Sequence, residues 1–316
     1  MNDLEVQFAR HRASNALQLV LIIAALALVL ALPAWLIAGR VGVLWALAMV
    51  AVTVLLAGRM PARVVLARSG ARPLSRRQAP GLYGLLDELY ERARMPSEPR
   101  LYLVPSPQLN AFAVGTAADG SIAVTDGLLR RLAARELAGV LAHETSHLRH
   151  NDTRVMSMAA AMTQLTMFGA TAIQILLLLY LPWLLAGAID IPIALLLAAA
   201  FSPTVSTLLQ LALSRNREYT ADLEAVALTG DPAGLAAALD VLERANGSWL
   251  RTIFGREPSP VSCLRTHPPT ARRIERLRPL SDASAGRGLS AERFDTHPGR
   301  FVRPHDGTPM HWFGRR

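Results

Sequence analysis

The sequence has a single cysteine, Cys263, in 316 residues, which excludes an internal disulfide and a cysteine-rich metal site. It is also poor in aromatic residues (6%) and in charged residues (18%), whereas 52% of its residues are hydrophobic. Its mean hydropathy is positive. This balance indicates a membrane protein, and the lone cysteine fits a reducing compartment.

The net charge of +9 could indicate a nucleic-acid-binding protein, but the repeated basic and aromatic pattern of such proteins is missing. The arginines instead gather near the ends of apolar runs and in the C-terminal part of the chain. We therefore expect the lipid bilayer, with its anionic headgroups, as a partner and no nucleic acid.

Four apolar runs are long enough to cross a bilayer core, which takes about 20 residues of helix. They cover residues 16–38, 41–57, 162–189 and 191–213. The predicted fold is a mostly α membrane protein with about four transmembrane helices, paired as hairpins within residues 1–58 and 162–213. Two alternatives stay open: the first run could be a secretory signal, and the second pair could be buried core helices. Pro182 and Pro203 should each kink their helix.

Arginines surround the first hairpin but are scarce in its turn, which holds only Arg40. The flanking arginines are Arg10, Arg12, Arg59, Arg63, Arg68, Arg72, Arg76 and Arg77. Since cytoplasmic segments next to membrane helices carry an excess of arginine and lysine, both flanks should be cytoplasmic.

Residues 143–147 read His-Glu-Thr-Ser-His. On a helix, positions i and i+4 share a face, so His143 and His147 can bind one metal ion, with Glu144 placed to take a proton from a water. Apolar residues recur with helical period over residues 128–150, between charged ones, which predicts one amphipathic helix outside the membrane. Gly139, one turn earlier, should let another element pack closely. The alternative is an exposed helix face that carries these residues by chance.

A catalytic zinc ion needs a third protein ligand, and Glu218 is the best candidate. Asp222 follows it at i+4 on a predicted helix, which suits a carboxylate that accepts the free ring N–H of a ligand histidine. Pairing of Glu218 with Arg215 or Arg217 is the alternative. Because two apolar runs separate His147 from Glu218, the chain must cross the membrane an even number of times for these ligands to meet.

Together these residues resemble the HtpX-type membrane zinc metallopeptidases, whose wider family includes the CAAX prenyl endopeptidases. The resemblance spans about residues 80–278. Besides the His-Glu-Thr-Ser-His motif it rests on residues 110–113, 122–129, 214–222, 266–270 and 273–274. It implies an endopeptidase that binds one Zn²⁺ per chain through His143, His147 and Glu218. Glu144 would be the catalytic acid and base, and Asp222 would support the ligands.

The resemblance also implies the substrates and the location of the protein. The substrates would be polypeptides, including damaged or misassembled membrane proteins. The catalytic domain would lie on the cytoplasmic face of a bacterial inner membrane.

Between the first hairpin and the metal helix, the pattern predicts a small zincin-like α+β unit. It should contain a helix at residues 81–95 and strands at residues 100–104, 110–114 and 121–125. In zincins a strand beside the metal commonly holds an extended substrate by edge pairing. The resemblance assigns this role to Ile122, Ala123 and Val124, and also to Asn110 and Ala113. An ordinary structural hairpin is the alternative.

Residues 59–161 and 214–280 are thus two parts of one catalytic unit. Within the second part, the resemblance places His267 and Arg273 near the site, and Arg273 could stabilise an oxyanion. For His267 the alternative is a hydrogen bond that fixes its loop. Residues 281–316 are rich in Arg, Gly, Pro and His without periodicity, which predicts a mobile basic tail.

Two other classes of function fit parts of the sequence. The first is a non-proteolytic zinc-binding membrane scaffold or chaperone with an inert site, which is less favoured because Glu144 is present together with all three ligands. An intramembrane protease would carry the motif within a span, but the motif helix contains Arg130, Arg131, Arg135 and Glu136. His150 could compete as a ligand, but Glu218 explains more, so we expect His150 at the surface or behind the ligands.

Overall fold

The computed structural model describes residues 3–57, 61–188, 190–246, 272–277, 279, 299–302 and 311–314. The chain forms two compact units. Unit 1 comprises Met1–Met60 and Arg154–Ser214, and unit 2 comprises Pro61–Thr153 and Arg215–Arg316. The boundaries predicted from the sequence lie at 58/59, 161/162 and 213/214. His267 lies outside the described residues, and so does most of the predicted tail at 281–316.

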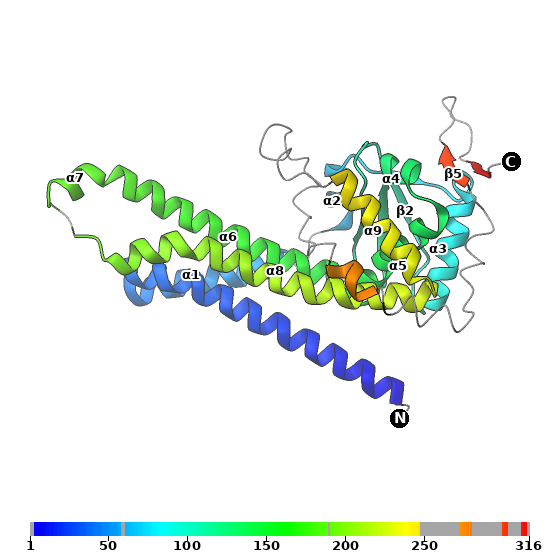
Figure 1. Cartoon of the computed structure of the whole chain (residues 1–316). Helices are drawn as coiled ribbons and strands as arrows, with labels where there is room; N and C mark the ends of the chain where they lie inside the picture. The colour runs from blue at the N-terminus through cyan, green and yellow to red at the C-terminus, as the bar shows by residue number, and fades with distance from the viewer. Residues whose placement is uncertain are drawn as a thin grey trace. The chain divides into compact units, whose positions relative to one another are not determined.

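The first element of unit 1, α1 (Asp3–Ala57), is broken at Ala38 and Gly39, where the backbone leaves the helical region and Gly39 has a φ of 55°. Figure 1 shows the blue helix reversing direction there. Leu26 and Val50 belong to one buried cluster, although 24 residues of unbroken helix would separate them by about 36 Å. Gly42 is required at the turn, since a Cβ atom there would collide with the carbonyl oxygen of Ala34.

The second apolar region consists of α6 (Asp152–Leu179), the short α7 (Leu181–Leu185) and α8 (Ile193–Thr229). Residues 162–189 were expected to form one helix kinked at Pro182. Instead α6 ends at Leu179, and Pro182 lies in the first turn of α7, where its missing N–H is tolerated. Pro203 lies inside α8. Within the described residues, three helices are long and apolar enough to cross a membrane, counting the two halves of α1 as one.

Unit 2 is built on a four-stranded sheet in the order β1-β2-β4-β3. Its strands are β1 (Arg72–Leu74), β2 (Leu101–Val104), β3 (Ala111–Val114) and β4 (Ser121–Thr125). β4 is parallel to β2 and antiparallel to β3, which is therefore an edge strand.

Helices cover both faces of this sheet. On one face Ile122 and Val124 pack in a core with α3 (Pro80–Arg92), α5 (Ala134–Arg149) and α9 (Pro232–Asn246). On the other face Ala123 packs with Phe112 and with Leu66 of α2 (Ala62–Arg68). Alternate residues of β4 thus enter two apolar layers, so every one of its residues is buried.

The predicted helix at 128–150 is two helices, α4 (Asp126–Arg131) and α5, so that prediction was wrong. Leu132 and Ala133 are extended, with ψ angles of 141° and 165°. Leu132 is buried at this break, and the carboxylate of Glu136 accepts a hydrogen bond from the N–H of Ala133 at 2.7 Å. Burial of Leu132 and this N-terminal cap therefore outweigh the continuous helical rhythm.

The described part of the predicted tail contains β5 (Gly299–Val302) and β6 (His311–Gly314), which pair antiparallel. The tail's mobility stays a prediction.

Candidate metal centre

Helix α5 presents the His-Glu-Thr-Ser-His motif in the interior of unit 2. His143 and His147 are 5% and 9% exposed. Gly139 allows α9 to approach closely, since a Cβ atom on it would lie 3.0 Å from the Cα of Leu235. The close packing expected at this glycine is confirmed. α5 is not among the candidate membrane helices.

The predicted third ligand meets the two histidines. Nε2 of His143 lies 3.2 Å from Nε2 of His147 and 3.3 Å from Oε2 of Glu218, and Nε2 of His147 lies 3.6 Å from Oε1 of Glu218. Ligands about 2.0–2.2 Å from a tetrahedral zinc ion lie roughly 3.3–3.6 Å apart. The three donors are therefore spaced to hold one such ion, and they form a possible metal-binding group.

Each histidine has a carboxylate behind it. Nδ1 of His143 lies 3.0 Å from Asp222, as predicted for that residue, and Nδ1 of His147 lies 3.1 Å from Asp152. A carboxylate at Nδ1 holds the proton on that nitrogen and leaves Nε2 free to bind a metal. Asp152 was missed by the sequence reasoning because it belongs to the next helix, beyond a turn at Asn151 with a φ of 56°.

Each carboxylate is in turn paired with a buried arginine. Nε and Nη2 of Arg273 contact both oxygens of Asp222 at 2.7 and 2.5 Å, and its Nη1 lies 3.1 Å from Glu218. Arg217 pairs with Asp152 and not with Glu218. The result is two parallel arrays, Arg273–Asp222–His143 and Arg217–Asp152–His147, behind the two predicted ligands.

The charges in this cluster favour cations. Burial lowers the pKa of His147, but hydrogen bonds from its ring to Asp152 and Glu218 raise it well above its usual value. Burial also lowers the pKa of His143, but contacts with Asp222 and Glu218 outweigh this effect and bring the pKa above its usual value. Conversely, burial raises the pKa of Asp222, whereas Arg273 and His143 bring it below its usual value. Buried carboxylates thus dominate the electrostatics, which suits a divalent ion.

Glu144 lies beside this cluster and is 7% exposed. Among the described residues, its carboxylate has no hydrogen-bond or ion-pair partner, in contrast to Glu218 and Asp222. A buried carboxylate next to the ligand group is the kind of side chain that can serve as a general base.

The edge strand β3 packs against α5. The N–H of Thr125 donates to the carbonyl of Asn110 at 3.0 Å, which makes this a hydrogen-bonded pair of the β3–β4 ladder. Such pairs alternate, so the N–H and C=O groups of Ala111 and Ala113 point away from β4. Within the described residues, no strand pairs with that edge.

The expected substrate contacts must be corrected in part. Edge pairing through Ile122, Ala123 and Val124 is excluded, because β4 already has a neighbour on each side and is buried. Asn110 and Ala113, at the edge strand, stay candidates.

His150 is not part of the ligand group. Its Nε2 lies 2.6 Å from Oε2 of Glu224. Ser146 and Arg149 contact the same carboxylate.

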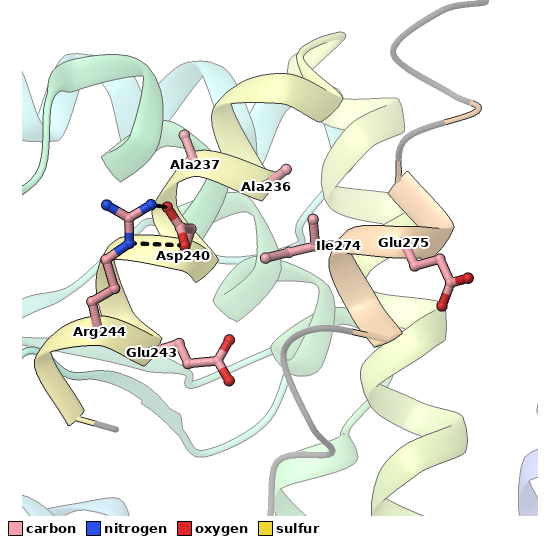
Figure 2. A pocket seen from close by; sticks show the side chains of 7 residues that line it. All are labelled: Ala236, Ala237, Asp240, Glu243, Arg244, Ile274 and Glu275. Atoms are coloured by element: carbon pink, nitrogen blue, oxygen red, sulfur yellow. Dashed lines mark hydrogen bonds and ion pairs between the residues drawn. The ribbon is translucent and has the colours of Figure 1, made fainter. Parts of the chain in front are cut away.

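A cavity of about 700 Å³ lies apart from the ligand residues, between α9 and the helical segment 272–277. Figure 2 shows Ile274 facing Asp240 and Arg244, which pair with each other on α9. The neighbouring Arg273 instead contacts the carboxylates beside the histidines. The cavity is therefore separate from the candidate metal site.

Comparison with known proteins decides the family. The pattern of "Peptidase family M48" matches residues 76–281, which include every residue of the ligand cluster. The chain belongs to peptidase family M48. The resemblance inferred from the sequence is thus confirmed, and the protein is a metallopeptidase with membrane helices.

Several relatives of this peptidase are named "Protease HtpX homolog". The protein from Nostoc punctiforme is 37% identical over 72% of this chain and 80% of its own length. That from Acaryochloris marina is 38% identical over 77% and 86%, and that from Desulforapulum autotrophicum is 32% identical over 88% and 94%. A solved structure, Ste24p of S. mikatae, covers 86% of this chain and 67% of its own, with 21% identity and a TM-score of 0.49.

Proposed function

We propose that this M48 peptidase is a zinc-dependent endopeptidase that cleaves membrane or misfolded proteins at the cytoplasmic face of a bacterial inner membrane. The observation that carries the proposal is the spacing of His143, His147 and Glu218, whose donor atoms lie 3.2–3.6 Å apart. When bound there, zinc supplies Lewis-acid chemistry that acidifies water and polarises a carbonyl.

The protein's own residues then have distinct tasks. Glu144 takes a proton from the attacking water and returns it to the nitrogen of the leaving amine. Asp222 and Asp152 orient the rings of His143 and His147. The guanidinium of Arg273 is committed to Asp222 and Glu218, which favours a role in positioning them over the oxyanion role that the sequence suggested.

Substrate binding is assigned to the edge of β3. An extended peptide can pair with the backbone groups of Ala111 and Ala113, while the side chain of Asn110, without a partner among the described residues, offers a further hydrogen bond. Backbone pairing gives affinity with little dependence on side chains, which suits a peptidase that acts on varied misfolded chains.

Four membrane crossings are the arrangement we favour. Trp35 and Trp45 flank the break in α1, Tyr180 and Trp183 flank the start of α7, and all four are more than half exposed. Tyrosine and tryptophan prefer the interface between lipid and water. Two aromatic-flanked turns fit two hairpins whose open ends, rich in arginine, face the cytoplasm.

Zinc content tests the proposal. Purified protein should hold one zinc per chain, and the Glu218→Ala variant should hold much less, because zinc loses a third of its protein ligands. A folded wild-type protein without zinc would contradict the proposal. Zinc held without any proteolysis would support the alternative, a zinc-binding membrane scaffold or chaperone.

A further inference from the structure

Glu224 of α8 contacts α5 outside the ligand cluster. Its Oε2 accepts a hydrogen bond from Oγ of Ser146 at 2.5 Å and lies 2.6 Å from Nε2 of His150, and its Oε1 pairs with Arg149. Its side chain is only 12% exposed. Two residues of α5 and its C-cap residue, His150, are thus held by one residue of α8.

Helices α5 and α8, which supply the predicted metal ligands, already meet at His143 and Glu218. The contacts of Glu224 join the same two helices along a second line. Glu224 follows Glu218 by six positions (224 − 218), so it projects about 120° away from it around α8. Ser146 projects about 100° away from His147 around α5. A single line of contact lets a helix roll about its axis, but two lines at different angles fix both its distance and its rotation.

The charges strengthen this contact. Arg149 and His150 lie at the C-terminal end of α5, where positive charge is favourable and an unpaired carboxylate would be repelled. Burial raises the pKa of Glu224, but contacts with His150, Ser146 and Arg149 bring it down to about 2. Glu224 is therefore an anion across the physiological range and stays paired with these groups.

We propose that Glu224 is a positioning residue that sets the distance and rotation of Glu218 relative to His143 and His147 before the metal binds. The inference rests on the proposed zinc site. It predicts that the intact contact makes the site preorganised, so that binding zinc requires little rearrangement of α8.

The test compares Glu224→Ala with Asp231→Ala in the full-length, detergent-solubilised protein. Asp231 is a matched control, because it precedes α9, accepts the N–H of Gly234 in the first turn of that helix, and accepts two bonds from Arg135 of α5 at 2.9 and 2.7 Å. It thus ties α5 to α9, which carries no predicted ligand. Zinc affinity is measured by competition with a chelator, thermal stability on the metal-free protein, and site geometry from the visible spectrum of the cobalt-substituted protein.

Glu224→Ala should weaken zinc binding about tenfold or more and alter the cobalt spectrum. Asp231→Ala should lower the thermal midpoint while its zinc affinity stays within about twofold of wild type. Glu224→Asp, which keeps the charge, should recover part of the affinity, and it replaces the alanine variant if that one fails to fold. Equal zinc affinity in wild type and Glu224→Ala would overturn the inference, and so would equal losses in both alanine variants. A wild type that binds no zinc would instead overturn the proposed function.

Discussion

Asp152 holds the ring of His147: a carboxylate oxygen of the first residue lies 3.1 Å from Nδ1 of the second. Asp222 makes the equivalent contact with His143 at 3.0 Å. An arginine is paired with each aspartate in turn. Both predicted ligand histidines are therefore oriented by the protein itself, with Nε2 turned toward Glu218.

Replacing Asp152 with Asn should weaken zinc binding about 10- to 100-fold, because the amide cannot stabilise the Nδ1 proton as a carboxylate does. The change also leaves the buried Arg217 without its anionic partner. Chelator competition measures the affinity. Asp87→Asn is the control, since Asp87 forms a surface ion pair with Arg76 and should leave zinc binding unchanged. Unaltered affinity in Asp152→Asn would show that Asp152 does not orient His147.

Acid should destabilise the metal-free protein through Glu224. Its pKa of about 2 in the folded state lies below the ordinary 4.5, so its stabilisation is complete above pH 4.5 and is lost as pH falls toward 2. A shift of this size corresponds to roughly 3 kcal/mol. Thermal midpoints recorded from pH 6 to pH 2 should therefore fall less steeply for Glu224→Gln than for wild type. Parallel curves would mean that this carboxylate does not contribute.

Proline at position 113 should impair substrate binding and spare the fold. The N–H of Ala113 points away from β4, so proline removes no bond of the sheet and edge strands tolerate it. Loss of one backbone hydrogen bond to substrate is worth about 1 kcal/mol, so KM should rise roughly fivefold with kcat little changed. Ala113→Val, which keeps the N–H, is the control. An unchanged KM in the proline variant would remove β3 from the substrate site.

Membrane topology can be read from single cysteines in a Cys263→Ser background. With four crossings, cysteines in place of Arg40 and Ala188 should react with an impermeant thiol reagent from outside the cell. A cysteine in place of Arg72 should react only after the membrane is made permeable. Position 188 reacting like position 72 would mean that the second hairpin does not span the bilayer.

Local pattern predicted the residues that share a helix face, and non-local packing accounts for what it missed. The i, i+4 spacings identified His143, His147, Glu218 and Asp222, and the structure brings all four together. Asp152 and Arg217 could not be paired from the sequence, because 65 residues (217 − 152) and two apolar helices separate them.

The order of the strands could not be predicted from the sequence either. The sequence predicted a strand at residues 121–125, but its place between β2 and β3 depends on pairing across the sheet. That placement moves the candidate substrate contacts from β4 to β3. Likewise, the break at Leu132 depends on burial of that side chain and on the cap from Glu136, and not on the hydrophobic period.

The most direct measurement is cleavage of an unfolded model protein by detergent-solubilised wild type and Glu144→Gln, each with and without added zinc. The account predicts zinc-dependent cleavage by wild type. It predicts equal zinc content but at least a 100-fold loss of rate in the variant, because only the proton acceptor is removed. Full activity of Glu144→Gln would contradict the role of Glu144, and zinc-loaded wild type without cleavage would contradict the assignment as an endopeptidase.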